Sequence, residues 1–483
     1  MNSDNINNKL ISEILSSNNN NEDNHKNIFY KEKNGVIPLD IIDDFDDDSN
    51  FLLIFVNPTS GSQEGKQIFE YIERYKEASI KDYNIIHFPV IEENDWIFTP
   101  TLTRSNSIQS LEEIKIKGGE HPTKFDASIP FTIIVFNIID KKDYEKGKFF
   151  IKNYLNDFPK QEIKIIIGGG DGSVLSIIED LNKDKINLKK CKFGVIPLGT
   201  GNDLSNSMGF GYECEIGIKI EYFQRVLYTY LTASDINIDI WQLQTEVDKN
   251  EGTISVIDHS KEKILNDNVK YPLKNLQKTF INYMSIGFDA MVGFRVGQMR
   301  TGSRFLNKII YFWESAKDVF KGLVHKNLGL PSLLESFEEE NELDNTKKLI
   351  FKTKDREKGK VEKGTTILRG NPILIVCQNI DFYLGGVENI WENSSKIGIQ
   401  AIGLKRKEKK IFEEKIMKSY DKQSCSDKKI EFFTYDHLMD MGLDKLFGIR
   451  AKKVYQGSGP FYFTFKKNPS KSQKKKLNKV YII

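Results

Sequence analysis

The chain has 483 residues, of which 39% are hydrophobic and 29% charged, a composition typical of a globular protein with enough apolar residues for two or three domains. Its 70 Lys and Arg nearly balance its 68 Asp and Glu, so the net charge of +2 neither favours nor excludes an anionic partner. The four cysteines form no C-x-x-C pair, which argues against a disulfide framework or a zinc module and fits a reducing compartment.

The start of the chain is polar and rich in Asn and Asp, and we expect a disordered leader over residues 1–50. The leader lacks the apolar core of a signal peptide. No apolar run anywhere in the sequence approaches the roughly 20 residues that a bilayer-spanning helix needs. We therefore expect a cytoplasmic protein with no signal peptide or transmembrane segment, whose contact with a membrane is peripheral.

Short apolar runs alternate with helical spacing over residues 51–234. Strands are predicted at Phe51–Val56, Ile85–Val90, Phe131–Ile139, Ile163–Ile167 and Phe193–Pro197. Helices are predicted at Gln63–Lys76, Lys142–Asp157 and Val174–Leu181. The polar stretch 95–127 is expected to be an inserted surface loop. This alternation predicts an α/β domain with a parallel sheet and helices on both of its faces.

The pattern changes over residues 235–465, where strand-like runs are separated by turns and charged segments. The runs are INIDIWQL, KTFINYMSIGF, NPILIVCQNI, KIGIQAIGL, KKIEFFTY, KKVYQGS and PFYFTF. They predict a mainly antiparallel β domain, with one amphipathic helix at Arg304–Lys321. Two acid- and lysine-rich stretches, Glu246–Lys274 and Glu335–Gly364, are expected to be surface insertions.

A lysine-rich tail without acids occupies residues 466–483. Such a tail can bind an anionic membrane, at about 1 kcal/mol per lysine near the surface. A solvated end without a partner is the alternative.

A run of glycines joins a predicted strand to a predicted helix in GGGDGS, residues 168–173. Glycines allow the backbone to approach a phosphate closely, and the first N–H groups of the following helix then point at the anion. The sequence is neither a Walker loop nor a Rossmann fingerprint, since both spacings are absent. A tight turn leading into a capped helix is the structural alternative.

Asp171 is the unusual member of this loop, because a carboxylate repels a phosphate unless a cation bridges the two or the carboxylate accepts a proton. It therefore suits Mg²⁺ organisation or general-base chemistry on an attacking hydroxyl. Its structural alternative is an N-cap of the helix expected to begin near Ser173.

Two further turns follow predicted strands. Residues 57–62, NPTSGS, offer an amide, hydroxyls and flexible backbone, and residues 197–203, PLGTGND, offer Thr200 and Asn202 beside two glycines. In a parallel α/β sheet all three turns lie at the carboxyl ends of strands, which is where ligands bind. Their joint occurrence is more specific than any one of them.

With these motifs the chain resembles the diacylglycerol kinase family, from about Phe51 to Phe465. NPTSG resembles the N-P-x-S-G nucleotide motif, GGDGS resembles the G-G-D-G-T signature, and PLGTGND is intact. Three later segments resemble the accessory domain of that family: FINYMSIGFDA (280–290), NIDFYLGGVENIW (379–391) and DHLMDMGL (436–443).

The resemblance implies a two-domain lipid kinase, with an α/β catalytic domain over residues 51–234 and a β-sandwich accessory domain over residues 235–465. ATP with Mg²⁺ would be the phosphate donor, and diacylglycerol at an anionic membrane surface would be phosphorylated to phosphatidic acid in lipid signalling. No nucleic-acid partner is expected.

The resemblance also assigns the candidate site residues. Asp171 is the expected catalytic base or its metal-linked equivalent, through Mg-ATP. The expected nucleotide-binding residues are Asn57, Thr59, Ser60, Gly169, Gly170, Gly172, Ser173, Thr200, Gly201 and Asn202. Apart from the resemblance, Asp436 and Asp440 are candidates for a metal site in the accessory region, and a solvated strand end is the alternative.

Departures from the family pattern keep alternatives open. Ser173 replaces a Thr, and His437 replaces a Gly of the accessory motif. Gln456 and Ser458 stand where two acids that help bind Mg-nucleotide are expected. A sphingoid-base or ceramide kinase, an NAD kinase, and a catalytically weakened lipid-binding scaffold are therefore the alternatives to a diacylglycerol kinase.

Overall fold

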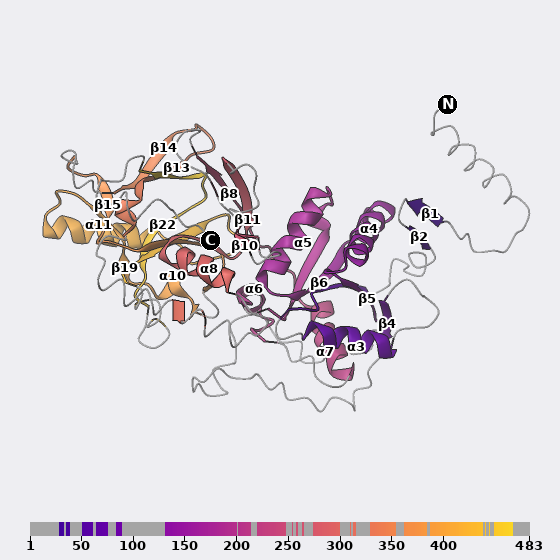
Figure 1. The fold of residues 1–483 in the computed structure, drawn as a ribbon. Helices are drawn as coiled ribbons and strands as arrows, with labels where there is room; N and C mark the ends of the chain where they lie inside the picture. Colours follow the sequence, from indigo (N-terminus) through magenta and orange to yellow (C-terminus); the bar gives the residue numbers. More distant parts are fainter. Residues whose placement is uncertain are drawn as a thin grey trace, which may run out of the picture.

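The computed structural model contains two sheet-based units (Figure 1). We call them the α/β unit (residues 51–232) and the β unit (residues 241–465). The structure describes residues 29–32, 35–38, 51–60, 64–75, 84–88, 131–199, 201–213, 220–247, 254, 257–258, 263–264, 274–299, 310, 313–314, 329–353, 362–383, 387–437, 440, 444 and 449–466.

The α/β unit is built on a five-stranded sheet with the order β4-β5-β3-β6-β7. These strands are β3 (Phe51–Val56), β4 (Asn84–Phe88), β5 (Phe131–Asn137), β6 (Ile163–Gly169) and β7 (Cys191–Pro197). β5, β3, β6 and β7 run parallel, and β4 joins one edge antiparallel to β5. Every residue of β3 is buried, as expected for a strand whose sheet is covered on both faces.

Helices cover both faces of this sheet (Figure 1). They are α3 (Gly65–Tyr75), α4 (Lys141–Asp157), α5 (Asp171–Lys183), α6 (Asp203–Ser207) and α7 (Ile220–Thr232). Alternate β3 residues, beginning with Phe51, share a core with α4 and α5, whereas the residues between them pack with α3 and α7. The prediction of a parallel sheet with helices on both faces is confirmed.

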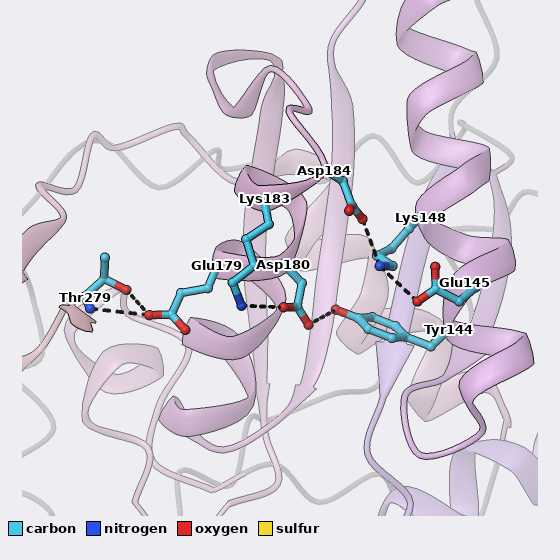
Figure 2. Close-up of polar contacts among 8 residues, drawn as sticks. All are labelled: Tyr144, Glu145, Lys148, Glu179, Asp180, Lys183, Asp184 and Thr279. Atoms are coloured by element: carbon cyan, nitrogen blue, oxygen red, sulfur yellow. Dashed lines mark hydrogen bonds and ion pairs between the residues drawn. The ribbon is translucent and has the colours of Figure 1, made fainter. Parts of the chain in front are cut away.

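Polar contacts join α4 to α5 along the edge of their shared core (Figure 2). The Tyr144 hydroxyl donates to Oδ2 of Asp180 at 3.2 Å, and Nζ of Lys148 lies 2.8 Å from Oδ2 of Asp184. The two helices thus form one layer, with the first turn of α5 at the end of strand β6.

The β unit contains two five-stranded sheets, β12-β16-β21-β22-β19 and β20-β15-β14-β13-β23. Their strands are β12 (Tyr283–Gly287), β13 (Leu334–Glu340), β14 (Lys347–Lys352), β15 (Thr366–Leu368), β16 (Leu374–Gln378), β19 (Lys396–Ile397), β20 (Ile399–Ala401), β21 (Ile430–Tyr435), β22 (Lys452–Gly457) and β23 (Phe461–Phe465). Pairing is antiparallel except between β14 and β15 and between β19 and β22. One apolar core takes residues from both sheets, so the predicted mainly antiparallel sandwich is confirmed.

Smaller elements complete the described chain. They are β1 (Phe29–Glu32), β2 (Gly35–Pro38), β8 (Trp241–Glu246), β9 (Ile257–Asp258), β10 (Lys263–Ile264), β11 (Asn275–Phe280), β17 (Phe382–Tyr383), β18 (Val387–Glu388), α8 (Phe288–Gln298), α10 (Ile390–Asn393), α11 (Arg406–Lys418) and the 3-10 turns η3 (Leu188–Lys190) and η5 (Leu330–Ser332). β11 pairs with β8 in a separate two-stranded ribbon.

The structure corrects one expectation. The acidic stretch from Glu335 is not an insertion, because β13 and β14 lie within the second sheet and bury Phe337, Ile350 and Phe351. Within the predicted leader, β1 and β2 pair antiparallel, and disorder over residues 1–50 stays a prediction. The predicted loop 95–127, most of the predicted helix Arg304–Lys321 and the tail after Lys466 lie outside the described residues.

Among the helices that the structure describes, none combines the length and the apolar character that crossing a membrane requires.

Phe337 tests the sandwich core. Its fully buried ring stacks on Phe463 at a centroid distance of 4.4 Å and contacts Phe432 at 4.7 Å. We expect Phe337→Ala to lower the free energy of unfolding by about 3–5 kcal/mol, because it removes contacts and leaves a cavity. Denaturant unfolding measures this loss. Leu343→Ala, at a side chain that is 94% exposed, is the control, and equal stability of the two variants would contradict the assigned core.

Candidate functional site

Three turns meet at one edge of the parallel sheet. Val56 pairs with Gly168, and Gly169 pairs with Pro197, so β3, β6 and β7 end side by side. The backbone N–H of Asn57 donates to the carbonyl of Gly168 at 2.8 Å, and that of Leu198 donates to the carbonyl of Gly169 at 3.1 Å. The structure therefore brings together the three turns that the sequence singled out.

Two of these turns touch through their backbones. A Cβ atom on Gly199 would lie 2.2 Å from Cα of Gly170, and a Cβ on Gly170 would lie 3.0 Å from Cα of Gly199. Both positions therefore require glycine, since a side chain at either would force the turns apart. The backbone N–H of Asp171 also donates to the carbonyl of Gly201 at 3.3 Å.

Asp171 opens α5, directly after the end of β6, and its side chain is partly buried. Its Oδ2 accepts from the backbone N–H of Asp203 at 3.1 Å and from Nδ2 of Asn282 at 2.8 Å. Its Oδ1 accepts from the backbone N–H of Leu204 at 3.2 Å. Asp171 thus does not cap its own helix, whose N-cap is Gly170, but binds the first N–H groups of α6.

Burial raises the pKa of Asp171 from its usual value of 3.8 to about 7, and the nearby charge of Asp203 acts in the same direction. The three hydrogen bonds that Asp171 accepts favour its charged form and oppose this rise. A carboxyl group with a pKa near neutrality can accept a proton from a hydroxyl group and release it again, which suits general-base chemistry.

The first turn of α5 faces open space at the exposed Gly172. A Cβ atom on Gly172 would meet no heavy atom within 4 Å, in contrast to the crowded Gly170. Ser60 lies nearby, since its Oγ would be 3.9 Å from a Cβ on Gly169. The N-terminus of this 13-residue helix presents its positive dipole end toward the same space.

The other predicted nucleotide-binding residues differ in their roles. Oδ1 of Asn57 accepts from the backbone N–H of Thr59 at 3.0 Å and from its hydroxyl at 2.8 Å, which closes the turn after β3. Ser173 packs beside Gly169 at the start of α5. Thr200 lies outside the described residues.

Asn202 makes hydrogen bonds within its own loop. The residue is fully buried, and its Oδ1 accepts from the N–H of Gly199 at 3.0 Å. Its Nδ2 donates to the carbonyls of Gly199 at 2.9 Å and Tyr212 at 2.8 Å. The amide is engaged on both sides within the chain and holds the loop closed, and a nucleotide contact of Asn202 stays a prediction.

Asp436 and Asp440, the two aspartates predicted to bind a metal ion in the β unit, form ion pairs with basic side chains of the same unit. Asp436 forms an ion pair with Lys452, and Oδ1 of Asp440 lies 3.1 Å from Nη1 of Arg450. Within the described part of the chain, no group of three or more His, Cys, Asp and Glu side chains is arranged to hold a metal ion. These contacts supply a structural reason for both aspartates.

Gln456 and Ser458 occupy the positions where acids were expected. Gln456 is buried in β22, where its Oε1 accepts from the N–H of Asp421 at 2.7 Å and its Nε2 donates to Oε1 of Glu431 at 2.8 Å. The backbone N–H of Ser458 donates to Oε1 of Glu339 at 3.1 Å. Both positions are engaged within the β unit.

Sequence reasoning missed Asn282, which links the two units at Asp171. The residue stands in the quoted segment FINYMSIGFDA, but nothing in that segment indicates its partner 111 residues away. The available signal was an asparagine between Ile281 and Tyr283, and in the structure its side chain is half-buried.

Comparison with known proteins agrees with both units. Residues 132–224 match the diacylglycerol kinase catalytic domain, and residues 279–473 match the diacylglycerol kinase accessory domain. Together these segments make up more than half of the chain.

Individual relatives match over part of their length. Diacylglycerol kinase 2 of Arabidopsis thaliana is 28% identical over 163 residues, which are 32% of this chain and 20% of the relative. Diacylglycerol kinase 7 of the same plant is 30% identical over 171 residues, which are 32% of this chain and 34% of the relative. A crystal structure of a Bacillus anthracis protein assigned as a diacylglycerol kinase is 12% identical, covers 91% of this chain and 95% of that one, and has a TM-score of 0.29.

Two domains of one family, in the order catalytic then accessory, match much of the α/β unit and most of the β unit, respectively. The chain belongs to the diacylglycerol kinase family.

Proposed function

We propose that the protein is an ATP-dependent lipid kinase that phosphorylates the free hydroxyl of diacylglycerol to form phosphatidic acid. The observation that carries this proposal is the position of Asp171: a carboxyl group with a pKa near 7, at the point where three strand-end turns meet. The family relatives named diacylglycerol kinases support the choice of substrate, although the chain matches only about a fifth to a third of the two relatives compared.

The turns and the start of α5 suit the phosphates of ATP. The glycines allow close approach of the backbone, and the helix dipole favours an anion next to Gly172 and Ser60. Thr59 is exposed and adds a hydroxyl at the edge of the same turn. The proposed nucleotide-contacting set is Asn57, Thr59, Ser60, Gly169, Gly170, Gly172, Ser173, Thr200 and Gly201.

Asp171 would act as the general base. As the lipid hydroxyl oxygen forms its bond to the γ-phosphorus, the bond from that phosphorus to the β–γ bridging oxygen breaks and ADP leaves. The hydroxyl proton passes to the Asp171 carboxylate. Positioning and neutralisation of charge supply most of the rate enhancement in such transfers.

Mg²⁺ fits this site as a companion of the nucleotide. The ion usually takes one or two carboxylates together with phosphate oxygens and water, and does not need an all-protein cage. Asp171 and the buried Asp203, whose charge acts on it, are the acids available at the turns. When bound, Mg²⁺ would neutralise charge that develops on the phosphates.

Two other functions of the same fold need separate tests. A sphingoid base or ceramide also offers a hydroxyl acceptor, so a panel of lipid acceptors in mixed vesicles distinguishes these substrates. The scaffold hypothesis depended on Gln456 and Ser458, which both form hydrogen bonds inside the β unit. A scaffold would bind vesicles but show no heat on titration with Mg-ATP.

Replacement of the proposed base tests the function directly. We expect wild-type protein to convert diacylglycerol in anionic vesicles to phosphatidic acid with labelled ATP. Asp171→Asn should lower kcat/KM by about 10²- to 10⁴-fold, the usual contribution of a general base. Far-ultraviolet circular dichroism checks that the variant is folded. Equal activity of the two proteins would remove Asp171 from the mechanism.

The raised pKa of Asp171 predicts a specific pH profile. The base is active when deprotonated, so kcat/KM should fall as the pH is lowered through about 7. An ordinary aspartate would keep its charge down to about pH 4. Initial rates of phosphatidic acid formation between pH 5 and 9 measure this acidic limb, and a profile that is flat down to pH 5 would contradict the assignment.

Substitutions at two glycines test ATP binding and stability separately. Gly172→Ala introduces a methyl group where the protein leaves open space, so stability should be retained while the Kd for ATP rises. Gly199→Ala forces a methyl group against Gly170, and should lower the free energy of unfolding by about 1–3 kcal/mol. Calorimetric titration with Mg-ATP and thermal unfolding measure the two effects. Unchanged ATP affinity in Gly172→Ala would place the phosphates elsewhere.

A further inference from the structure

A short turn of the β unit reaches into the candidate site. Asn282 lies between β11 and β12, and its Nδ2 donates to Oδ2 of Asp171 at 2.8 Å. The side chain of Asp171 accepts three hydrogen bonds from described residues: two come from the α/β unit itself, and this one comes from the β unit. The orientation of the carboxylate therefore depends on both units.

The backbone of Asn282 is held in place independently of Asp171. Its carbonyl accepts from the N–H groups of Asn379 at 2.9 Å and Ile380 at 3.3 Å. Asn379 is fully buried, and its Nδ2 donates to the carbonyls of Ile281 at 2.6 Å and Asp239 at 2.9 Å. These hydrogen bonds fix the backbone from which the Asn282 side chain extends toward Asp171.

Two isoleucines close to Asn282 in the sequence or in space pack into the α/β unit. Ile281 and Ile380 come from the β unit, yet both are buried in the core that α4 and α5 share with the sheet of the α/β unit. Burial of two isoleucine side chains is the non-directional part of the contact between the units. Asn282, which lies between Ile281 and β12, adds the directional part.

Two other polar contacts cross the same boundary without touching Asp171. Ser207, at the end of α6, donates to Oδ1 of Asp381. Thr279, in β11, donates through its hydroxyl and its N–H to Glu179 of α5, as Figure 2 shows. These contacts hold the units together, and they offer controls for a test of Asn282.

We propose that Asn282 is a positioning residue through which the accessory domain holds the Asp171 carboxylate in its reacting orientation, so that phosphoryl transfer depends on the two domains being docked. The proposal rests on the proposed kinase function and deepens it. Asn282 does not touch the reacting atoms; it acts through Asp171. Oδ2 accepts from both Asp203 and Asn282, whereas Oδ1 accepts one hydrogen bond, from Leu204, so Oδ1 is the oxygen that would accept the hydroxyl proton.

The test compares Asn282→Leu, which keeps the approximate size but removes the donor, with Ser207→Ala, which removes a contact at the same boundary. We expect Asn282→Leu to lower kcat by about 10- to 100-fold with little change in KM for ATP, as for a misplaced catalytic group. Ser207→Ala should keep kcat within about twofold. Asn282→Gln, which retains an amide donor, should recover part of the lost kcat.

A double-mutant cycle supplies a second readout. In the Asp171→Asn background, Asn282→Leu should cost little further activity, whereas Ser207→Ala should have the same small effect in both backgrounds. Thermal unfolding of each single variant identifies any general loss of structure.

The outcomes separate the two levels of the proposal. Wild-type protein that phosphorylates diacylglycerol, combined with equal losses of kcat in Asn282→Leu and Ser207→Ala, would overturn the role of Asn282 and leave the kinase function standing. Additive effects of Asn282→Leu and Asp171→Asn would do the same. Wild-type protein inactive on every lipid acceptor would overturn the proposed function itself and the inference with it.

Discussion

The site depends on how closely two turns approach one another. Gly170 and Gly199 meet backbone to backbone, with no room for a Cβ on either. This contact is possible because β6 and β7 are parallel and end in register at Gly169 and Pro197. The sheet therefore fixes the distance between the loops, and the loops fix where Asp171 begins its helix.

Hydrogen bonds to the start of α6 hold the partly buried carboxylate of Asp171 in place. α6 is only five residues long, and its N-cap, Asn202, uses its side chain to close the preceding loop instead of capping the helix. Two of the N–H groups at the start of α6 are satisfied by Asp171 from another helix. The hydrogen bonds that satisfy the start of α6 thus offset part of the cost of burying Asp171. A residue suited to catalysis therefore also has a structural function.

Much of this arrangement follows from local sequence. β3, β5, β6 and β7 are continuous apolar runs, and the turns after them contain the glycines that close approach requires, so the sheet and the meeting of the turns were predictable. The strands that begin near Glu335 were not predictable, because the many charged residues there suggested a surface insertion. Phe337 and Phe351, which lie among those charges, are the residues buried in the core. Asn202 and Asn282 were not predictable in role, since an amide serves a ligand or the chain equally well until its neighbours in space are known.

Gln456 shows how a departure from a family motif depends on packing. Glu431 beside it is fully buried, and burial is the main cause that raises its pKa to about 8. The amide of Gln456 donates to Glu431 with one end and accepts from the N–H of Asp421 with the other. An acid at this position would lose the donor and place a second buried carboxyl group next to Glu431, which is costly without a cation. The neutral side chain therefore fits the interior of this sheet, and the departure from the family motif has a local structural reason.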